Sequence, residues 1–316
     1  MNRNYLYSRI HSNVDSIEIE SESIYLFGIS AEERSEFVRK LINRNNVNTN
    51  FIQIEAKDRD IIAISCSNEE YNLRSADNIS SLLNKYTKQS IYIDVTGLDN
   101  RICAPLIRRA IEQVKTSENL KLNVMYAEPG TYNIKKFKAE NVFNDLSEKI
   151  EGIEPLPGYA TIFPDGNIED ELLVAFLGFE GGRYTYVLEN VQTPNENIIP
   201  VIGVPGFRPE YPFLTYWGNR FSLYESETWR KQKLVSANSL VEVYLMLQKM
   251  IKENPNKRIK VAPIGTKPHA IGAMISAVMN ERNIEIVYDN PKRRIKRSEG
   301  IGNINEFKVC KLIREN

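Results

Sequence analysis

Residues 258–268, RIKVAPIGTKP, decide how this chain is interpreted. The apolar run predicts a β-strand, Gly265 predicts the turn that ends it, and Pro268 suits the first turn of a helix. The small and apolar residues that follow predict a helix near residues 267–281. Strand, turn and helix in this order form the repeating unit of an α/β protein.

An earlier part of the chain has the same arrangement. Residues 90–101, SIYIDVTGLDNR, also combine an apolar strand with glycine and a helix start, and both segments lead to a strand that ends in Tyr-x-x-Pro, at Pro129 and Pro291. Residues 24–34, IYLFGISAEER, weakly match residues 174–183, VAFLGFEGGR. These echoes predict two Rossmann-like halves related by internal duplication. The alternative is two unrelated αβ units that share the strand, glycine and helix pattern.

Apolar runs bounded by turn signals alternate with amphipathic stretches along the whole chain. This pattern predicts the α/β class, with mostly parallel sheets flanked by helices. Residues 151–158, EGIEPLPG, are rich in proline and glycine and are typical of a linker. We therefore expect one Rossmann-like domain at residues 1–150 and a second at residues 151–316.

Composition excludes several classes of protein. Lys plus Arg and Asp plus Glu are balanced at 41 each among 316 residues, so no overall field draws the chain to nucleic acid or to an anionic membrane. Three cysteines without metal-ligand spacing fit a reduced intracellular protein, and two histidines argue against a multi-histidine metal site. No apolar run is long enough to span a bilayer. We expect a cytoplasmic protein with no metal, no cofactor and no membrane partner.

The turn at Gly265, Thr266 and Lys267 is the leading candidate site. Glycine allows a phosphate to approach the backbone, threonine offers a hydroxyl, lysine supplies charge, and a helix N-terminus supplies N–H groups. The pattern is neither a G-x-x-x-x-G-K-[ST] loop nor a dinucleotide fingerprint, which disfavours hydrolysis of nucleoside triphosphates. The alternative is a strand-to-helix turn that needs glycine and proline only for its shape.

This strand, its Gly-Thr-Lys-Pro turn and the small-residue helix resemble the ligand loop of CARF-type and related SAVED-type Rossmann-like sensor domains. Those families bind cyclic oligonucleotides in prokaryotic antiviral defence, and their loops usually have two glycines before Thr-Lys, where this chain has Ile264 before Gly265. The resemblance implies that Gly265, Thr266 and Lys267 contact ligand phosphate. It also implies that Thr96 and Gly97 form the counterpart in the first half.

Charged residues near other strand ends are further candidates. Arg34 and Arg183 follow predicted strand ends and can fork onto a phosphate, although first-turn charges often serve only the helix. His269, Asp94 and Glu32 are the candidates for acid or base catalysis. A lone histidine more often caps or packs than reacts.

The basic run at residues 291–297, PKRRIKR, offers five cations for nucleic-acid phosphates, or is a solvated loop. These cations are Lys292, Arg293, Arg294, Lys296 and Arg297. Aromatic residues at 211–221 can stack on bases, but a local packing cluster is favoured. These aromatic residues are Tyr211, Phe213, Tyr216, Trp217 and Phe221.

The sequence thus predicts a protein that binds an anionic nucleotide or oligonucleotide in the crevice between its halves. By resemblance it would be a sensor or accessory protein of prokaryotic defence, with an effector protein or a second copy as possible partners. The first alternative is an enzyme that cleaves or transfers a phosphoester or glycosidic bond of a nucleotide. The second is a nucleic-acid-binding subunit of a larger complex.

Overall fold

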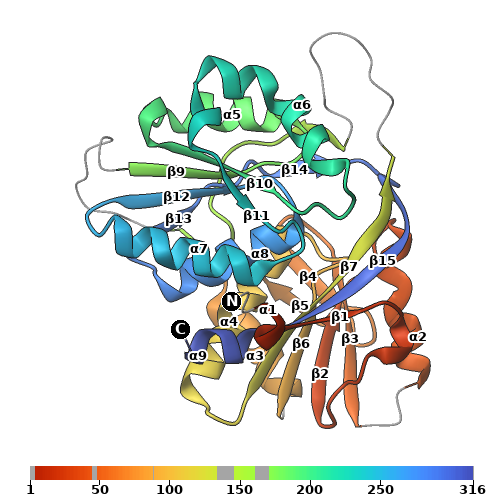
Figure 1. The fold of residues 1–316 in the computed structure, drawn as a ribbon. Helices are drawn as coiled ribbons and strands as arrows, with labels where there is room; N and C mark the ends of the chain where they lie inside the picture. Colours follow the sequence, from red (N-terminus) through yellow and green to blue (C-terminus); the bar gives the residue numbers. More distant parts are fainter. Residues whose placement is uncertain (1–3, 45–47, 88, 134–145, 161–170, 316) are drawn as a thin grey trace. The chain divides into compact units, whose positions relative to one another are not determined.

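The computed structural model describes residues 4–44, 48–87, 89–133, 146–160 and 171–315, which form two compact units (Figure 1). Unit 1 comprises Met1–Asn133 and Ile295–Asn316, and unit 2 comprises Ile134–Arg294. The sequence placed the boundary at 150 and the C-terminal segment in the second half. The C-terminal strand instead pairs with unit 1, because its register with the long strand 121–132 supplies it with backbone partners.

The sheet of unit 1 is mixed, and its described strands have the order β1-β15-β7-β6-β2-β3-β4-β5. The four central strands β7, β6, β2 and β3 are parallel to one another, and the outer strands pair antiparallel. The strands are β1 (Ser8–His11), β2 (Ser23–Phe27), β3 (Thr49–Ala56), β4 (Ile61–Ile64), β5 (Glu70–Asn72), β6 (Ser90–Asp94), β7 (Lys121–Tyr132) and β15 (Ser298–Lys308). The helices are α1 (Asn4–Tyr7), α2 (Phe37–Arg44), α3 (Ala76–Tyr86), α4 (Asn100–Thr116) and α9 (Val309–Glu315), with 3₁₀ turns η1 (Val14–Ser16) and η2 (Glu33–Glu36).

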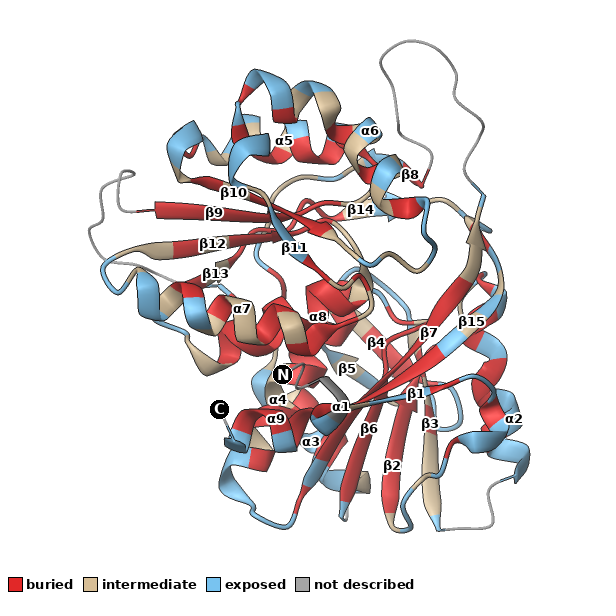
Figure 2. Cartoon of the chain, viewed as in Figure 1, coloured by how far each residue is buried: buried red, intermediate tan, exposed pale blue. Residues whose placement is uncertain are grey.

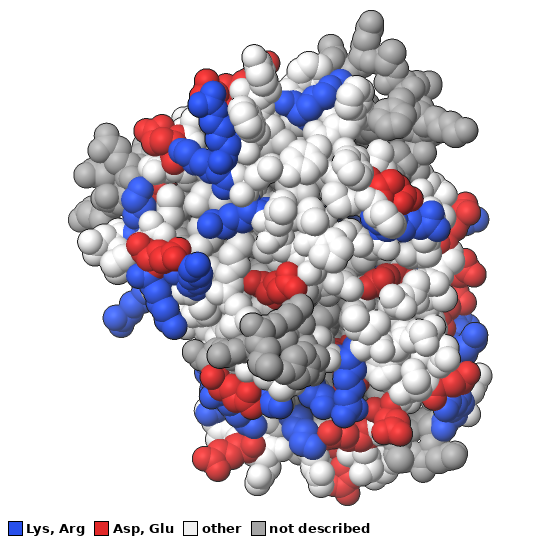
Figure 3. Space-filling view, viewed as in Figure 1, with Lys and Arg blue, Asp and Glu red and all other residues white. Residues whose placement is uncertain are grey.

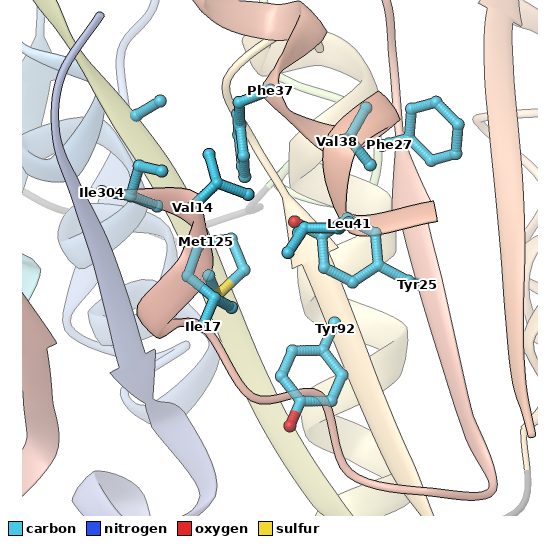
Figure 4. Packing of buried hydrophobic residues seen from close by; sticks show 11 residues of the cluster. Val14, Ile17, Tyr25, Phe27, Phe37, Val38, Leu41, Tyr92, Met125 and Ile304 are labelled. Atoms are coloured by element: carbon cyan, nitrogen blue, oxygen red, sulfur yellow. The ribbon is translucent and has the colours of Figure 1, made fainter. Parts of the chain in front are cut away.

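One core cluster of unit 1 lies between the sheet and α2 (Figure 4). Tyr25, Tyr92 and Met125 come from three adjacent parallel strands and share one face, because side chains at paired positions point the same way. Phe37 and Leu41 of α2 are one helical turn apart and cover that face. Burying each such side chain contributes about 1.5–3 kcal/mol, so this contact between α2 and the sheet helps to hold unit 1 together.

Unit 2 contains a parallel sheet of order β11-β10-β9-β12-β13 and a small antiparallel pair, β8 with β14. Helices α5 and α6 lie on one face of the parallel sheet and α7 and α8 on the other (Figure 1). The strands are β8 (Ser147–Ile150), β9 (Glu171–Phe176), β10 (Ile198–Gly203), β11 (Lys233–Val235), β12 (Arg258–Pro263), β13 (Ile284–Ile286) and β14 (Pro291–Arg293). The helices are α5 (Gly181–Val191), α6 (Tyr211–Glu225), α7 (Leu240–Glu253) and α8 (Lys267–Met279), with 3₁₀ turns η4 (Asn195–Asn197) and η5 (Thr228–Lys231).

Helix α8 is buried along nearly its whole length (Figure 2). Its residues are small and apolar, so it packs closely against α7. A Cβ atom at Gly272 would lie 2.7 Å from the backbone oxygen of Leu240 and 2.7 Å from Cβ of Val243. Glycine costs roughly 1 kcal/mol inside a helix, and this close approach is the reason for it here.

The predicted α/β class, with sheets flanked by helices, is confirmed, and four parallel strands of each unit share one order, to which unit 2 adds the parallel strand β11. In unit 1 the chain runs through β2, β3, β6 and β7 with the spatial order β3-β2-β6-β7. In unit 2 it runs through β9, β10, β12 and β13 with the spatial order β10-β9-β12-β13. None of the described helices is long and apolar enough to cross a membrane.

Candidate functional site

Each parallel sheet has a point where the chain reverses the direction in which it adds strands. In unit 2 this point lies between β9 and β12, since the chain first adds β10 and β11 on one side of β9 and then β12 and β13 on the other. Ligands of open α/β sheets bind outside the carboxyl ends of the strands at such a switch point. The Gly265–Lys267 turn follows β12 directly, so the leading candidate stands at the switch point of unit 2.

The Gly265–Lys267 turn has the predicted strand, turn and helix geometry. Thr266 is the N-cap of α8: its hydroxyl accepts a hydrogen bond from the backbone N–H of His269 at 3.4 Å and donates to the backbone oxygen of Ala237 at 2.6 Å. A Cβ atom at Gly265 would lie 2.7 Å from the backbone oxygen of Leu177, so the packing of this turn requires glycine. Gly265, Thr266 and Lys267 are all half-buried, and Lys267 is the first residue of the helix.

Arg183 contacts the residue before this turn, and its guanidinium is hydrogen-bonded to groups of unit 2. Its Nη1 donates to the backbone oxygen of Ile264 at 2.7 Å, while Nε and Nη2 form a two-pronged ion pair with Asp289 at 2.7 and 2.6 Å. Both side chains are buried, and the Asp289 carboxylate raises the pKa of Arg183 against the opposing effect of burial. All three nitrogens donate to partners inside unit 2, so Arg183 holds the turn in place.

His269 is fully buried in the first turn of α8. Its Nε2 lies 3.0 Å from the backbone oxygen of Ser236, so Nε2 carries the proton and Nδ1 has no partner among the described residues. Burial lowers the pKa of His269 from its ordinary value of 6.5 to about 4. The imidazole is therefore neutral at physiological pH and packs against Phe176, with the two ring centres 5.1 Å apart.

The counterpart turn in unit 1 stands at the switch point between β2 and β6 and carries acids in place of a lysine. Asp94 is buried, and it accepts hydrogen bonds from the N–H of Thr96 at 2.9 Å and from the hydroxyl of Tyr25 at 3.5 Å. Thr96 Oγ1 accepts from the N–H of Ala127 at 2.9 Å. A Cβ atom at Gly97 would lie 1.8 Å from the backbone oxygen of Gly28, so the loops after β2 and β6 touch.

Arg34 in unit 1 occupies the place that Arg183 has in unit 2. It is buried, and its Nη1 donates to the hydroxyl of Tyr126 at 3.0 Å and to the backbone oxygen of Ala127 at 2.8 Å. Tyr126-Ala127 and Tyr288-Asp289 stand at matching positions in the two Tyr-x-x-Pro segments. In each unit an arginine after the first parallel strand therefore binds the Tyr-x-x-Pro segment, which in unit 1 lies within β7 and in unit 2 follows β13.

A buried glutamate accompanies each arginine and binds part of the basic run. Glu32 accepts a hydrogen bond from the hydroxyl of Ser298 and pairs with Nε of Arg297 at 3.4 Å. Glu180 accepts from the hydroxyl of Ser147 at 3.1 Å and pairs with Nη1 of Arg293 at 3.0 Å. Glu32, a candidate catalytic residue, is 6 % exposed, and its carboxylate is bound by Ser298 and Arg297 of unit 1.

The rest of the basic run is also partly engaged. Lys292 pairs with Glu148 at 2.9 Å, and Nε of Arg294 donates to the backbone oxygen of Ser147 at 3.3 Å. Lys296 is exposed, with a backbone φ of 53°. Figure 3 shows both signs of charge interspersed over the face in view. Four of the five cations thus have partners within their own unit, while Lys292 and Lys296 remain exposed.

The aromatic residues of α6 form an exposed face and not the packing cluster that the sequence favoured. Tyr211 is buried, but Phe213 is 75 % and Trp217 47 % exposed, and Phe221 and Tyr224 are exposed as well. The guanidinium of Arg220 lies 4.2 Å from the ring centres of both Trp217 and Phe221. We call Phe213, Trp217, Arg220, Phe221 and Tyr224 the aromatic face of α6.

Sequence reasoning missed the partners that hold these candidates. Asp289, in the Tyr-x-x-Pro segment that ends at Pro291, was not recognised as the counter-ion of Arg183. The signal that points to it is a single acidic residue directly after an apolar strand, because a buried arginine elsewhere needs such a partner. Among the described residues, no group of three His, Cys, Asp or Glu side chains is arranged to hold a metal ion.

Comparisons with known proteins supply no family. No family model and no curated protein matches the chain. Among solved structures, a GDP-L-fucose synthetase from Naegleria fowleri is similar over 98 % of this chain and 91 % of its own, with 9 % sequence identity and a TM-score of 0.23. A likeness of this level carries no argument about this chain.

Proposed function

We propose that the protein binds an anionic nucleotide or oligonucleotide at the Gly265–Lys267 turn of unit 2. The observation that carries the proposal is the place of this turn at the switch point of a parallel sheet, directly before the N-terminus of a 13-residue helix. Lys267 brings a cation to this helix end, where the backbone dipole also favours negative charge. Thr266 serves as the cap of the helix, so lysine is the side chain expected to contact the ligand.

The proposed role is that of a sensor or accessory protein in prokaryotic defence. The support for it is the resemblance of the Gly-Thr-Lys-Pro turn and its helix to the CARF-type and SAVED-type sensor loops. Under this proposal cyclic oligonucleotides are the first ligands to test, and an effector protein or a second copy of the chain would respond to binding.

We also propose that the two units arose by internal duplication. The support is the common strand order, the contact between glycine-bearing loops at each switch point, and the matching glutamate and arginine after the first parallel strand. The copies differ where the ligand would bind, since unit 1 has Asp94 and Asp99 near its turn and Arg101 there pairs with Asp60. An anion is therefore expected at the turn of unit 2 and not at that of unit 1.

The test is a binding measurement with matched lysine variants. Small molecules released from the denatured protein are identified by mass spectrometry, and nucleotides including cyclic oligonucleotides are screened by thermal shift. Lys267→Ala is expected to weaken the best ligand about 10- to 100-fold, because a hydrogen bond to a charged group contributes about 1.5–3 kcal/mol. Lys252→Ala, an exposed lysine in the last turn of α7, is the control and is expected to bind normally. Unchanged affinity in a folded Lys267→Ala protein contradicts the proposal.

The aromatic face of α6 favours a second candidate function, the binding of single-stranded nucleic acid. Exposed aromatic rings with an interleaved arginine provide stacking surfaces for bases, worth about 1–3 kcal/mol per base. Single-stranded DNA should then quench the fluorescence of Trp217, and Phe213→Ala with Phe221→Ala should weaken binding at least tenfold. Binding that these substitutions leave unchanged would exclude the aromatic face of α6 as the contact surface.

No observation favours the enzyme alternative. Asp94, Glu32 and His269 are each buried and bonded within their own unit. The aromatic face of α6, and not the basic run, is what supports contact with nucleic acid.

A further inference from the structure

Unit 1 contains a cavity of about 630 Å³ at the amino ends of its central strands, the edge opposite the switch point. We call it the amino-edge pocket. Its volume is within the range of small-molecule sites, which run from about 300 to 1,000 Å³. The residues that matter for its chemistry are Arg9, Glu20, Tyr92, Asn123, Glu306 and Lys308. None of them belongs to the turns or to the arginine contacts described above.

Strand register brings the polar groups of this pocket together. Tyr92 on β6 pairs with Asn123 on β7, and Asn123 pairs with Lys308 on β15. Paired residues point to the same face, and adjacent strands are about 4.8 Å apart, so these three side chains form one row. In the next row, Arg9 on β1 pairs in register with Glu306 on β15.

Several hydrogen-bonding groups in this row are unused within the described part of the chain. Asn123 is 4 % exposed and lines the pocket, and its side-chain amide makes no hydrogen bond with any described residue. The Tyr92 hydroxyl accepts from the N–H of Glu20 at 3.3 Å and still has its own proton to donate. Arg9 and Lys308 form no ion pair within 4.0 Å with a described residue.

Carboxylates balance these cations. Glu20 is bound by Lys121 at 2.9 Å and by Ser90, and Glu306 is bound by Nε2 of His11 at 3.1 Å. Burial raises the pKa of Tyr92, and the charges of Glu20 and Glu306 raise it further, while the hydrogen bond from the Glu20 N–H and the charge of Arg9 lower it, so these groups surround the same small space. A ligand there meets the cations Arg9 and Lys308, which form no close ion pair with a described residue, and carboxylate oxygens that can accept hydrogen bonds.

We propose that the amino-edge pocket binds a small organic anion that also carries hydroxyl or amino groups. Its phosphate or carboxylate pairs with Arg9 and Lys308, while Asn123 and Tyr92 donate to its remaining acceptors. Its hydroxyl or amino groups donate to Glu20 and Glu306. The pocket is separate from the Gly265–Lys267 turn, and its occupant does not depend on what that turn binds.

The test uses two probes that separate the sources of the anion, AMP for a phosphate and L-glutamate for a carboxylate, by ligand-observed NMR on the full chain. At least one is expected to bind saturably at micromolar to millimolar concentration. Lys308→Met and Asn123→Leu are each expected to weaken it at least tenfold. Asn123→Leu fills the same space without polar atoms, so the fold should survive it. Lys115→Met, an exposed lysine of α4 outside the pocket, is the matched control.

Two results overturn the proposal. One is the absence of saturable binding of either probe to the folded protein, and the other is binding that Lys308→Met and Asn123→Leu leave unchanged. The Lys267→Ala variant shows which of the two sites binds AMP. If Lys267→Ala abolishes AMP binding and Lys308→Met does not, AMP occupies the turn of unit 2 and the amino-edge pocket is rejected as its site.

Discussion

Units 1 and 2 share the order of four parallel strands but have different side chains at the equivalent positions. Arg34 donates to a tyrosine hydroxyl and a backbone oxygen, whereas Arg183 forms an ion pair with the carboxylate of Asp289. The third residue of the helix after the switch point is Ile102 in α4 and His269 in α8. The comparison teaches that topology fixes where a side chain stands, while its partners decide whether it can bind a ligand or only supports the fold.

The largest expected difference between the units is in the loss of stability when the buried arginine of each is replaced. Arg183→Met leaves the Asp289 carboxylate unpaired inside unit 2 and is expected to lower the free energy of unfolding by about 3–5 kcal/mol. Arg34→Met removes donors from uncharged acceptors and should cost unit 1 about 1–3 kcal/mol. Both tryptophans, Trp217 and Trp229, belong to unit 2, so their fluorescence during urea unfolding reports on that unit.

A double variant tests the cause of the Arg183 effect. Arg183→Met combined with Asp289→Leu replaces the pair by apolar side chains and should recover much of the lost stability, because no buried charge remains. If the double variant is as unstable as the two single losses added together, the ion pair is not the source. For Arg34→Met, thiol labelling of the buried Cys103 in a Cys66→Ser, Cys310→Ser background reports the opening of unit 1.

Glycine substitutions at the two switch points compare how tightly the loops meet. Gly97→Ala places a Cβ 1.8 Å from the backbone oxygen of Gly28, and Gly265→Ala places one 2.7 Å from that of Leu177. Overpacking costs about 1–3 kcal/mol, so we expect the upper end for Gly97→Ala and the lower end for Gly265→Ala. Labelling of Cys103 measures the loss of stability in Gly97→Ala, and tryptophan fluorescence measures the loss in Gly265→Ala. Equal losses of stability in the two variants would show that the two pairs of loops accommodate the added methyl group equally well.

Sequence reasoning reached the α/β class with sheets flanked by helices and the strand-to-helix turn at Gly265, since these follow from local apolar patterns and turn residues. It could not assign the C-terminal strand to unit 1, because pairing between residues 298–308 and 121–132 is a long-range contact that no local pattern specifies. Arg183 was a candidate for ligand binding and Glu32 for catalysis, and both are buried in ion pairs. A charged residue after a strand looks the same in sequence whether its partner is a ligand or another side chain.

The amino-edge pocket lay outside the sequence prediction for a related reason. Asn123 stands alone within the apolar stretch of β7, where it is inconspicuous. Its relation to Lys308 and Arg9 arises only from the pairing of β7 with β15 and of β15 with β1. Such a site is built across strands that are far apart in the chain, so it becomes visible only with the register.

The smallest expected difference between the units is in the pH dependence of their stability. It comes from the third residue of the helix after each switch point. His269 has a folded-state pKa of about 4 against an ordinary 6.5, so between these values the unfolded chain binds a proton that the folded unit does not. The stability that comes from the neutral imidazole is full above about pH 6.5 and is lost as the pH falls toward 4. Between neutral pH and pH values near 4.5 the loss should be about 2 kcal/mol.

His269→Gln is the matched variant for this pH effect. Glutamine keeps an N–H that can donate to Ser236 and does not titrate, so other acid-sensitive groups affect both proteins equally. Urea unfolding of unit 2, followed by tryptophan fluorescence, should show the wild type losing about 2 kcal/mol more than His269→Gln on acidification. Parallel pH dependences in the two proteins would mean that His269 is protonated without cost in the folded state. Unit 1, with Ile102 at this position, should show no such difference by Cys103 labelling.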